Sequence, residues 1–319
     1  MNTMTFASTV TPIRFARFIA ALALIALAVS GCVSGGTSTP SGRAFTSPDR
    51  AVDSLVAAVR SGSPAGINDV LGPDANELVH SGDAVQDKNR AERFLALYDQ
   101  EHELVPADDG SVWLCIGESE WPFAIPLVKG GKAEAWRFDT ERGKEEILNR
   151  WVGENELSAI QVCLAIVDAE QDYAARPMPG GGCPEYAAKV ISDPGKTNGL
   201  YWEAKNGERE SPLGELVASA AEEGYEPGTH EPYHGYYYRI LTAQGPSADG
   251  GAYDYLVNGK LIGGFAVIAR PAAYGTSGVK TFIVNHEGTV CESDLGPKTD
   301  QLAKAIKSFD PGPEWQKVE

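Results

Sequence analysis

ENELSAIQVCLAIVDAEQDYA, residues Glu154–Ala174, is the stretch that decides the fold. Its apolar side chains recur at intervals of three and four residues and therefore share one face of a helix; they are Leu157, Ile160, Leu164 and Val167. The run RPMPGGG at residues 176–182 cannot continue a helix, because proline and glycine break it. We predict an amphipathic helix over Glu154–Ala174 whose apolar face needs a partner surface.

The residues after Gly235 predict that surface. The pattern changes there to a period of two, with Tyr236, Tyr238 and Ile240 facing one way and Tyr237, Arg239 and Leu241 the other. Further strands are expected over residues 253–257, 261–269, 279–284 and 289–291, and Asn258-Gly259 is a strong hairpin signal. We predict an antiparallel meander with the long helix on one face, and a last helix over residues 298–309.

Upstream of the long helix, helices come before strands. Ser47-Pro48-Asp49 has the residues of a helix start, a second helix is expected over residues 87–102, and strands over 112–116, 123–128 and 135–138. Thr140 can cap another helix, which Gly153 is expected to interrupt. The order predicts an α+β chain. Residues 45–140 would form a small helix-then-strand domain, and residues 141–319 a long helix packed on an antiparallel β meander.

The first 32 residues predict where the protein goes. Arg14 and Arg17 lead into the apolar run Phe18–Val29, and small residues follow, which is the layout of a secretory signal peptide. As a helix this run spans about 18 Å, too short for a hydrocarbon core of about 30 Å. We therefore predict a signal peptide over residues 1–31 and no stable membrane helix there.

Val29-Ser30-Gly31-Cys32 resembles the bacterial lipobox, in which the cysteine is lipidated and the chain is cut just before it. Residues 32–44 are rich in Gly, Ser, Thr and Pro, as expected of a flexible tether. Val33 after the cysteine resembles an outer-membrane sorting context. The expectation is a lipoprotein in the outer membrane facing the periplasm, and the alternative is a plain secreted protein.

The charge balance is strongly acidic. The formal net charge is −17, and removal of Arg14 and Arg17 with the leader leaves 25 basic against 44 acidic residues, or −19. Such a surface repels phosphate backbones, so nucleic acid is not an expected partner. The expected partners are the membrane, through the lipid anchor, and another envelope protein or polymer.

Four cysteines remain after Cys32: Cys115, Cys163, Cys183 and Cys291. In an oxidising compartment an even set favours disulfides, and four cysteines allow three pairings. We favour Cys163–Cys183, because the Gly-Pro-rich return after the helix could bring them together. Reduced, buried cysteines are the alternative. The paired spacing of zinc sites is absent, so no metal site is expected.

Catalytic motifs are weak. HEPYH at residues 230–234 spells H-E-x-x-H, but that motif binds zinc only on a helix, and Pro232 and Gly235 oppose one. No nucleophile elbow or phosphate loop is present. We therefore expect no catalytic residues and no cofactor.

Aromatic residues are the best indication of a working surface. Tyr236, Tyr237, Tyr238, Tyr253 and Tyr255 lie on adjacent predicted strands, with His234 beside them. Tyrosines favour interfaces because they combine contact area with a hydroxyl. The alternative is that they stabilise the sheet through cross-strand pairs.

Several motifs in order carry a family resemblance. They are WRFDT at 136–140, GENEL at 153–157, GLYW at 199–202, YHGYY at 233–237 and TFIVNH at 281–286. On these motifs the chain resembles the bacterial exported family catalogued as domain of unknown function 2950, from about Phe45 to Phe309. The region from Asn155 to Phe282 is also similar to the globular part of pseudopilins, which implies a pilin-like fold. Neither resemblance implies an activity.

These patterns predict a non-catalytic binding or structural module for an envelope component. The alternative is a cell-envelope hydrolase whose site is assembled from scattered residues. His234, His286 and a carboxylate converging within metal-ligand distance would favour the hydrolase.

Overall fold

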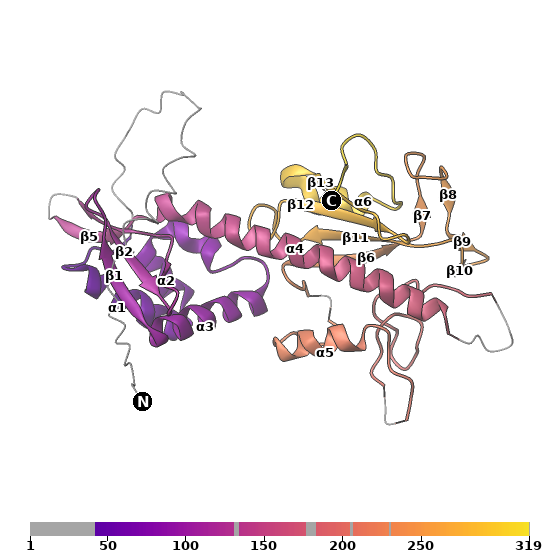
Figure 1. Cartoon of the computed structure of the whole chain (residues 1–319), viewed down its shortest axis with the longest axis horizontal. Coiled ribbons are helices and arrows are strands. Elements are labelled where there is room, and N and C mark those ends of the chain that lie inside the picture. The colour runs from indigo at the N-terminus through magenta and orange to yellow at the C-terminus, as the bar shows by residue number, and fades with distance from the viewer. Residues whose placement is uncertain (1–41, 131–133, 177–182, 205–206, 230, 319) are drawn as a thin grey trace, which may run out of the picture. The chain divides into compact units, whose positions relative to one another are not determined.

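A computed structural model describes residues 42–130, 134–176, 183–204, 207–229 and 231–318 (Figure 1). The predicted signal peptide, Cys32 and most of the predicted tether lie outside these residues. The described chain combines helices with antiparallel sheets, which confirms the α+β fold class. Among the described helices, none combines the length and the apolar character that crossing a bilayer requires.

The N-terminal part follows the predicted order of helices before strands. Its elements are α1 (Pro48–Arg60), α2 (Pro64–Leu71), the 3-10 helix η2 (Pro73–Leu78), α3 (Ala84–Gln100), β1 (His102–Pro106), β2 (Val112–Ile116), β3 (Trp121–Pro122), β4 (Leu127–Gly130) and β5 (Ala135–Phe138). The strands form a sheet in the order β1-β2-β4-β5, with β3 paired to β2. The helices and the sheet enclose an apolar core that includes Leu55, Leu114, Leu127 and Phe138.

Capping residues set the helix starts in this part. The Ser47 side chain accepts a hydrogen bond from the backbone N–H of Arg50, as expected of a cap for α1. Helix α3 begins three residues before the prediction because Asp83 caps it, its Oδ1 accepting from the N–H of Gln86 at 3.0 Å. Asp83 is 1% exposed, so this cap is part of the interior.

Helix α4 (Thr140–Ala174) is one continuous helix of 35 residues. The predicted interruption at Gly153 is wrong. A glycine inside a helix costs about 1 kcal/mol relative to alanine, which packing at both ends of the helix outweighs. Ile147 packs against the N-terminal core, and Cys163 and Ile166 belong to the C-terminal one.

The C-terminal part contains the predicted antiparallel meander. Its main sheet has the order β14-β13-β12-β11-β6. The strands are β6 (Tyr236–Leu241), β11 (Ala266–Pro271), β12 (Lys280–Asn285), β13 (Val290–Asp294) and β14 (Gln316–Lys317), with helices α5 (Gly214–Glu222) and α6 (Thr299–Ala305) and the 3-10 helix η3 (Gly296–Lys298). Strand β6 therefore lies at one edge of this sheet.

Two small ladders lie beside the main sheet. They are β7 (Ala243–Gln244) with β8 (Tyr253–Asp254), and β9 (Leu256–Val257) with β10 (Lys260–Leu261). Asn258 and Gly259 have φ angles of 53° and 78°, which confirms the predicted hairpin turn. The predicted single strand over 261–269 is wrong, because the extended conformation is interrupted at Gly264, whose φ is 139°.

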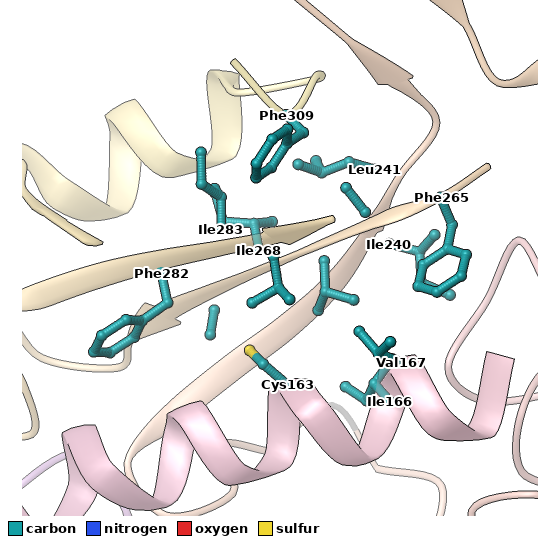
Figure 2. Close-up of a cluster of buried hydrophobic side chains, with 14 of the residues drawn as sticks. Cys163, Ile166, Val167, Ile240, Leu241, Phe265, Ile268, Phe282, Ile283 and Phe309 are labelled. Atoms are coloured by element: carbon teal, nitrogen blue, oxygen red, sulfur yellow. The ribbon is translucent and has the colours of Figure 1, made fainter. Parts of the chain in front are cut away.

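Helices cover both faces of the main sheet. Figure 2 shows Cys163, Ile166 and Val167 of α4 on the side of Ile240 and Phe282, with Leu241, Ile283 and Phe309 on the other side. On that second face the Arg239 guanidinium donates to the carbonyls of Ala303 and Ile306, at the end of α6. The predicted alternation of side chains along β6 is thus confirmed. The sequence had predicted that α4 covers one face of the sheet, but not that α6 packs on the other.

Candidate functional site

A mostly apolar groove of about 750 Å³ runs along the edge strand β6. We call it the β6 groove. Its lining comes from α4 (Val162, Ile166), residues 188–191, Tyr201, α5 with the residue before it (Leu213, Leu216, Val217, Ala220), residues 225–229 and 231–233, β6 (residues 237–240), β11 (Ile268, Arg270) and α6 (Ala303, Lys304). Because the lining includes residues from both faces of the sheet, the groove wraps around the edge of β6.

The backbone of β6 explains why this edge is open. The Ala272 N–H donates to the Gly235 carbonyl, so Gly235 and Ala272 form a hydrogen-bonded pair. In the same register, Tyr237, Arg239 and Leu241 also occupy hydrogen-bonded positions opposite β11. The backbone groups of the alternate residues therefore point away from β11. The Tyr236 carbonyl accepts from the Tyr233 N–H at 2.9 Å, and the Tyr236 N–H donates to the Tyr233 carbonyl at 3.1 Å. The Thr242 carbonyl accepts from the Tyr255 N–H at 2.8 Å.

Tyr238 and Ile240 lie between these two closed ends. Within the described residues, no hydrogen bond engages their outward N–H and carbonyl groups. Buried backbone groups are nearly always paired, and an unpaired strand edge is a template for another strand. The groove therefore presents the outward backbone groups of two alternate residues of β6, Tyr238 and Ile240, without a partner among the described residues.

Two aromatic side chains, Tyr225 and Tyr233, form an aromatic wall of the groove. The rings of Tyr225 and Tyr233 meet edge to face with centroids 4.9 Å apart. The Tyr225 hydroxyl donates to Asp83 Oδ2 at 2.9 Å, and the same oxygen accepts from the Gly235 N–H at 2.9 Å. Burial raises the pKa of Tyr225 well above its usual value and that of Tyr233 to about 12, so both hydroxyls stay neutral at neutral pH.

Arg239, Arg270 and Lys304 line the groove on the α6 face of the sheet, whereas a fourth basic residue, Lys189 of the 188–191 segment, pairs with Asp193. Arg270 Nη1 is 2.7 Å from Asp300 Oδ1, within ion-pair distance although outside hydrogen-bond geometry, and its guanidinium lies 4.4 Å from the centre of the Tyr237 ring. Lys304 pairs with the same aspartate at 2.8 Å. Arg239 has two carbonyl partners instead, and burial and then Arg270 lower its pKa.

The predicted tyrosine surface is only partly present. Tyr237 and Tyr238 line the groove. Tyr236 and Tyr255 are each 0% exposed and belong to the core, so their assignment to a binding surface is wrong. Tyr236 lies on the face that α4 covers, and Tyr255 donates to Gln244 Oε1 in the interior at 3.0 Å. Tyr253 is 41% exposed and is not part of the groove.

His234 lies next to the aromatic wall and not in the groove lining. Its Nε2 is 3.4 Å from Glu223 Oε2, and its ring is tilted against that of Tyr233 with centroids 4.2 Å apart. Its backbone φ of 50° belongs to a turn, and the described residues of the HEPYH motif are not helical. His230 lies outside the described residues.

His286 does not meet His234. The centroid of its ring lies 6.0 Å from that of Tyr255 and 6.4 Å from that of Phe265. Across the described part of the chain, no three His, Cys, Asp or Glu side chains are placed to hold a metal ion. The convergence that would favour a metal-dependent hydrolase is therefore not found there.

The four cysteines after Cys32 carry free thiols. Cys163 is 0% exposed and points from α4 toward the sheet (Figure 2). Cys183 is exposed. The structure therefore does not form the predicted Cys163–Cys183 disulfide. Burial raises the pKa of the Cys163 thiol far above its usual value, which makes it unreactive.

Residues of the family motifs join α4 to the sheet. Asn155, 0% exposed, donates to the Ser277 carbonyl at 2.8 Å and accepts from Gln86 Nε2 at 2.7 Å. Glu156 Oε1 accepts from the backbone N–H groups of Val279 and Lys280, both at 2.9 Å. These contacts give the motif residues a structural role.

Comparison with known proteins identifies a family. No curated protein and no solved structure matches the chain, so the likeness to pseudopilins stays a prediction. The family described as "Protein of unknown function (DUF2950)" matches residues 42–318, nearly the whole described chain. The protein therefore belongs to the DUF2950 family, as its motifs predicted.

Proposed function

We propose that the protein is an exported, lipid-anchored bacterial envelope protein that binds another envelope component without catalysis, and that the β6 groove is its binding site. Export and anchoring are supported by the leader sequence and by Cys32 in its lipobox-like context. The outer membrane, facing the periplasm, is the proposed location.

The observation that carries the binding role is the groove itself. Its volume of about 750 Å³ lies within the range of ligand sites, and apolar and aromatic side chains with a few polar groups form its lining. Tyr225, Tyr233 and Tyr237 supply aromatic contact area in the manner of interface tyrosines.

A cell-envelope hydrolase is the second candidate. Such a site needs a nucleophile or a metal-bound water next to a general base. Among the described residues that line the groove, Glu226 and Glu231 are the carboxylates, and no His or Cys accompanies them. The composition of the lining therefore favours binding over hydrolysis.

The test places a photo-crosslinking amino acid at Tyr237 in the full-length protein and irradiates intact cells. We expect a discrete adduct, which Ala220→Trp abolishes because the indole fills the groove. Ala218→Trp is the matched control, since Ala218 lies on the same helix, is exposed and does not line the groove. An adduct equally strong in both tryptophan variants would contradict the proposal.

The anchoring is tested separately. We expect intact-mass spectrometry of the protein extracted from membranes to show a chain that begins at Cys32 with acyl groups attached. Cys32→Ser should abolish acylation and release the protein from membranes. An unmodified Cys32 with the leader still attached would refute the lipoprotein assignment.

A further inference from the structure

We infer that the ligand of the β6 groove is an extended polypeptide segment that joins the main sheet as a strand alongside β6. This inference rests on the proposed binding role of the groove and names the class of its partner. The argument uses the backbone of β6, the side chains on its two faces and the charge of the chain.

The backbone of β6 identifies the partner as a polypeptide. Tyr238 and Ile240 direct two N–H and two carbonyl groups into the groove, with no partner among the described residues. Donors and acceptors alternate here at the spacing of a strand, which another peptide backbone matches directly. The bridge between Tyr233 and Tyr236 closes one end of the edge, and the hydrogen bond from Tyr255 to Thr242 closes the other.

The two faces of β6 predict the side chains of the added strand. Tyr238 and Ile240 lie on the face that also holds Val162 and Ile166 of α4, where an apolar side chain fits. On the other face lie Arg239, Arg270 and Lys304. Because side chains of a strand alternate between faces, the segment should alternate apolar and acidic residues.

Charge supports an acidic partner at this place. Asp300 pairs with Arg270 and Lys304, whereas Arg239 has carbonyl partners at 3.1 and 2.7 Å and forms no ion pair with any described residue. In a chain of net charge −17, the basic face of the groove is a local exception. A carboxylate placed there gains an opposite charge in a half-buried site.

A second copy of the protein is a poorer occupant. If β6 paired antiparallel with β6 of another molecule through Tyr238 and Ile240, the two Arg239 side chains would stand next to each other. Like charges directly opposite on neighbouring strands are destabilising. We therefore assign the groove to a different polypeptide.

The experiment selects ligands for the full-length protein, purified in detergent, from a phage-displayed library of random dodecapeptides. Selected peptides should alternate apolar and acidic residues and should lose binding to the Ala220→Trp variant but not to Ala218→Trp. Lys304→Glu should weaken binding about tenfold, the effect of losing about one charge-assisted contact, whereas Lys298→Glu outside the groove should not.

Amide hydrogen exchange measured by NMR tests the strand itself. On binding a selected peptide, amide exchange at Tyr238 and Ile240 should slow at least tenfold. Amide exchange at Arg239, whose N–H is directed toward β11, should not change. N-methylation of one paired peptide residue should weaken binding about fivefold, since a net hydrogen bond is worth about 1 kcal/mol.

The outcomes separate this inference from the proposed function. If peptides bind in a groove-dependent way but exchange at Tyr238 and Ile240 is unchanged, strand addition is refuted while the binding site stands. The same conclusion follows if no peptide is selected but the adduct at Tyr237 in cells is lost in Ala220→Trp, or if muropeptide fragments of peptidoglycan bind the groove instead. If that adduct is also insensitive to Ala220→Trp, the proposed function fails together with the inference.

Discussion

Glu170→Gln should remove a pH-dependent loss of stability from this protein. Glu170 lies on α4 and is 0% exposed. Its Oε2 accepts from the Ala187 N–H at 2.7 Å, and its Oε1 has no partner among the described residues. Burial raises its pKa from 4.5 to about 8, although the hydrogen bond from Ala187 and the charge of Arg176 lower it in part.

The raised pKa sets the sign and size of the effect. The folded protein holds the proton of Glu170 where the unfolded chain has lost it, so the stability from this group is complete below pH 4.5 and is lost as the pH rises toward 8. Each pH unit in this window costs about 1.4 kcal/mol, so the loss at pH 7 is about 3 kcal/mol. Glutamine keeps the oxygen that accepts from Ala187 and cannot ionise.

Urea unfolding between pH 5 and pH 8 measures this effect. The free energy of unfolding of Glu170→Gln, relative to the natural protein, should rise by about 1.4 kcal/mol per pH unit up to about pH 7. Asp168→Asn is the control, because it neutralises an exposed carboxylate on the same helix. Parallel pH profiles for the natural protein and Glu170→Gln would refute the reasoning.

Three further predictions concern other parts of the fold. Gly153→Ala should stabilise the protein by about 0.5–1 kcal/mol in thermal or urea unfolding, because the added methyl group meets nothing within 4 Å and α4 is continuous there; destabilisation would mean that the helix is broken at this position. Asp83→Ala should cost about 3 kcal/mol, since it leaves the N–H groups of Gln86 and Gly235 and the hydroxyl of Tyr225 without their acceptor, and an unchanged unfolding midpoint would refute that role. A thiol reagent should label Cys183 in the native protein and Cys163 only after unfolding, whereas protection of both until reduction would restore the disulfide prediction.

Local patterns predicted the elements of the fold well. The helix over Glu154–Ala174 and the turn at Asn258-Gly259 are present, because both signals depend on neighbouring residues in the chain. The predicted apolar face of the helix is only partly right: Val167 is buried and Ile160 and Leu164 are partly buried, but Leu157 is 69% exposed, and the buried face also contains Ala159, Val162, Cys163 and Ile166. The cap at Asp83 was missed because its partners include Tyr225 and Gly235, about 150 positions away. The predicted interruption at Gly153 was wrong because the low helix propensity of one glycine costs less than packing at both ends of the helix contributes.

The candidate site was harder to predict. The alternation of Tyr237 and Tyr238 was visible in the sequence, but the position of β6 at the sheet edge depends on the order β14-β13-β12-β11-β6. The walls of the groove come from α4, α5, α6 and the segments around Ala188 and Tyr225, which no local spacing brings together. For the same reason the burial of Tyr255 could not be read from its strand pattern, since Gln244 and the neighbouring ladder enclose it.

The continuity of α4 has a consequence for how the protein responds to mechanical force. One rod supplies Ile147 to the first hydrophobic cluster and Ile166 to the second, so a break near Gly153 would withdraw support from both clusters in a single event. Tension on the N-terminal part would be transmitted along α4 to the hydrophobic clusters at either end of this helix. A chain built in this way should lose its native structure all at once.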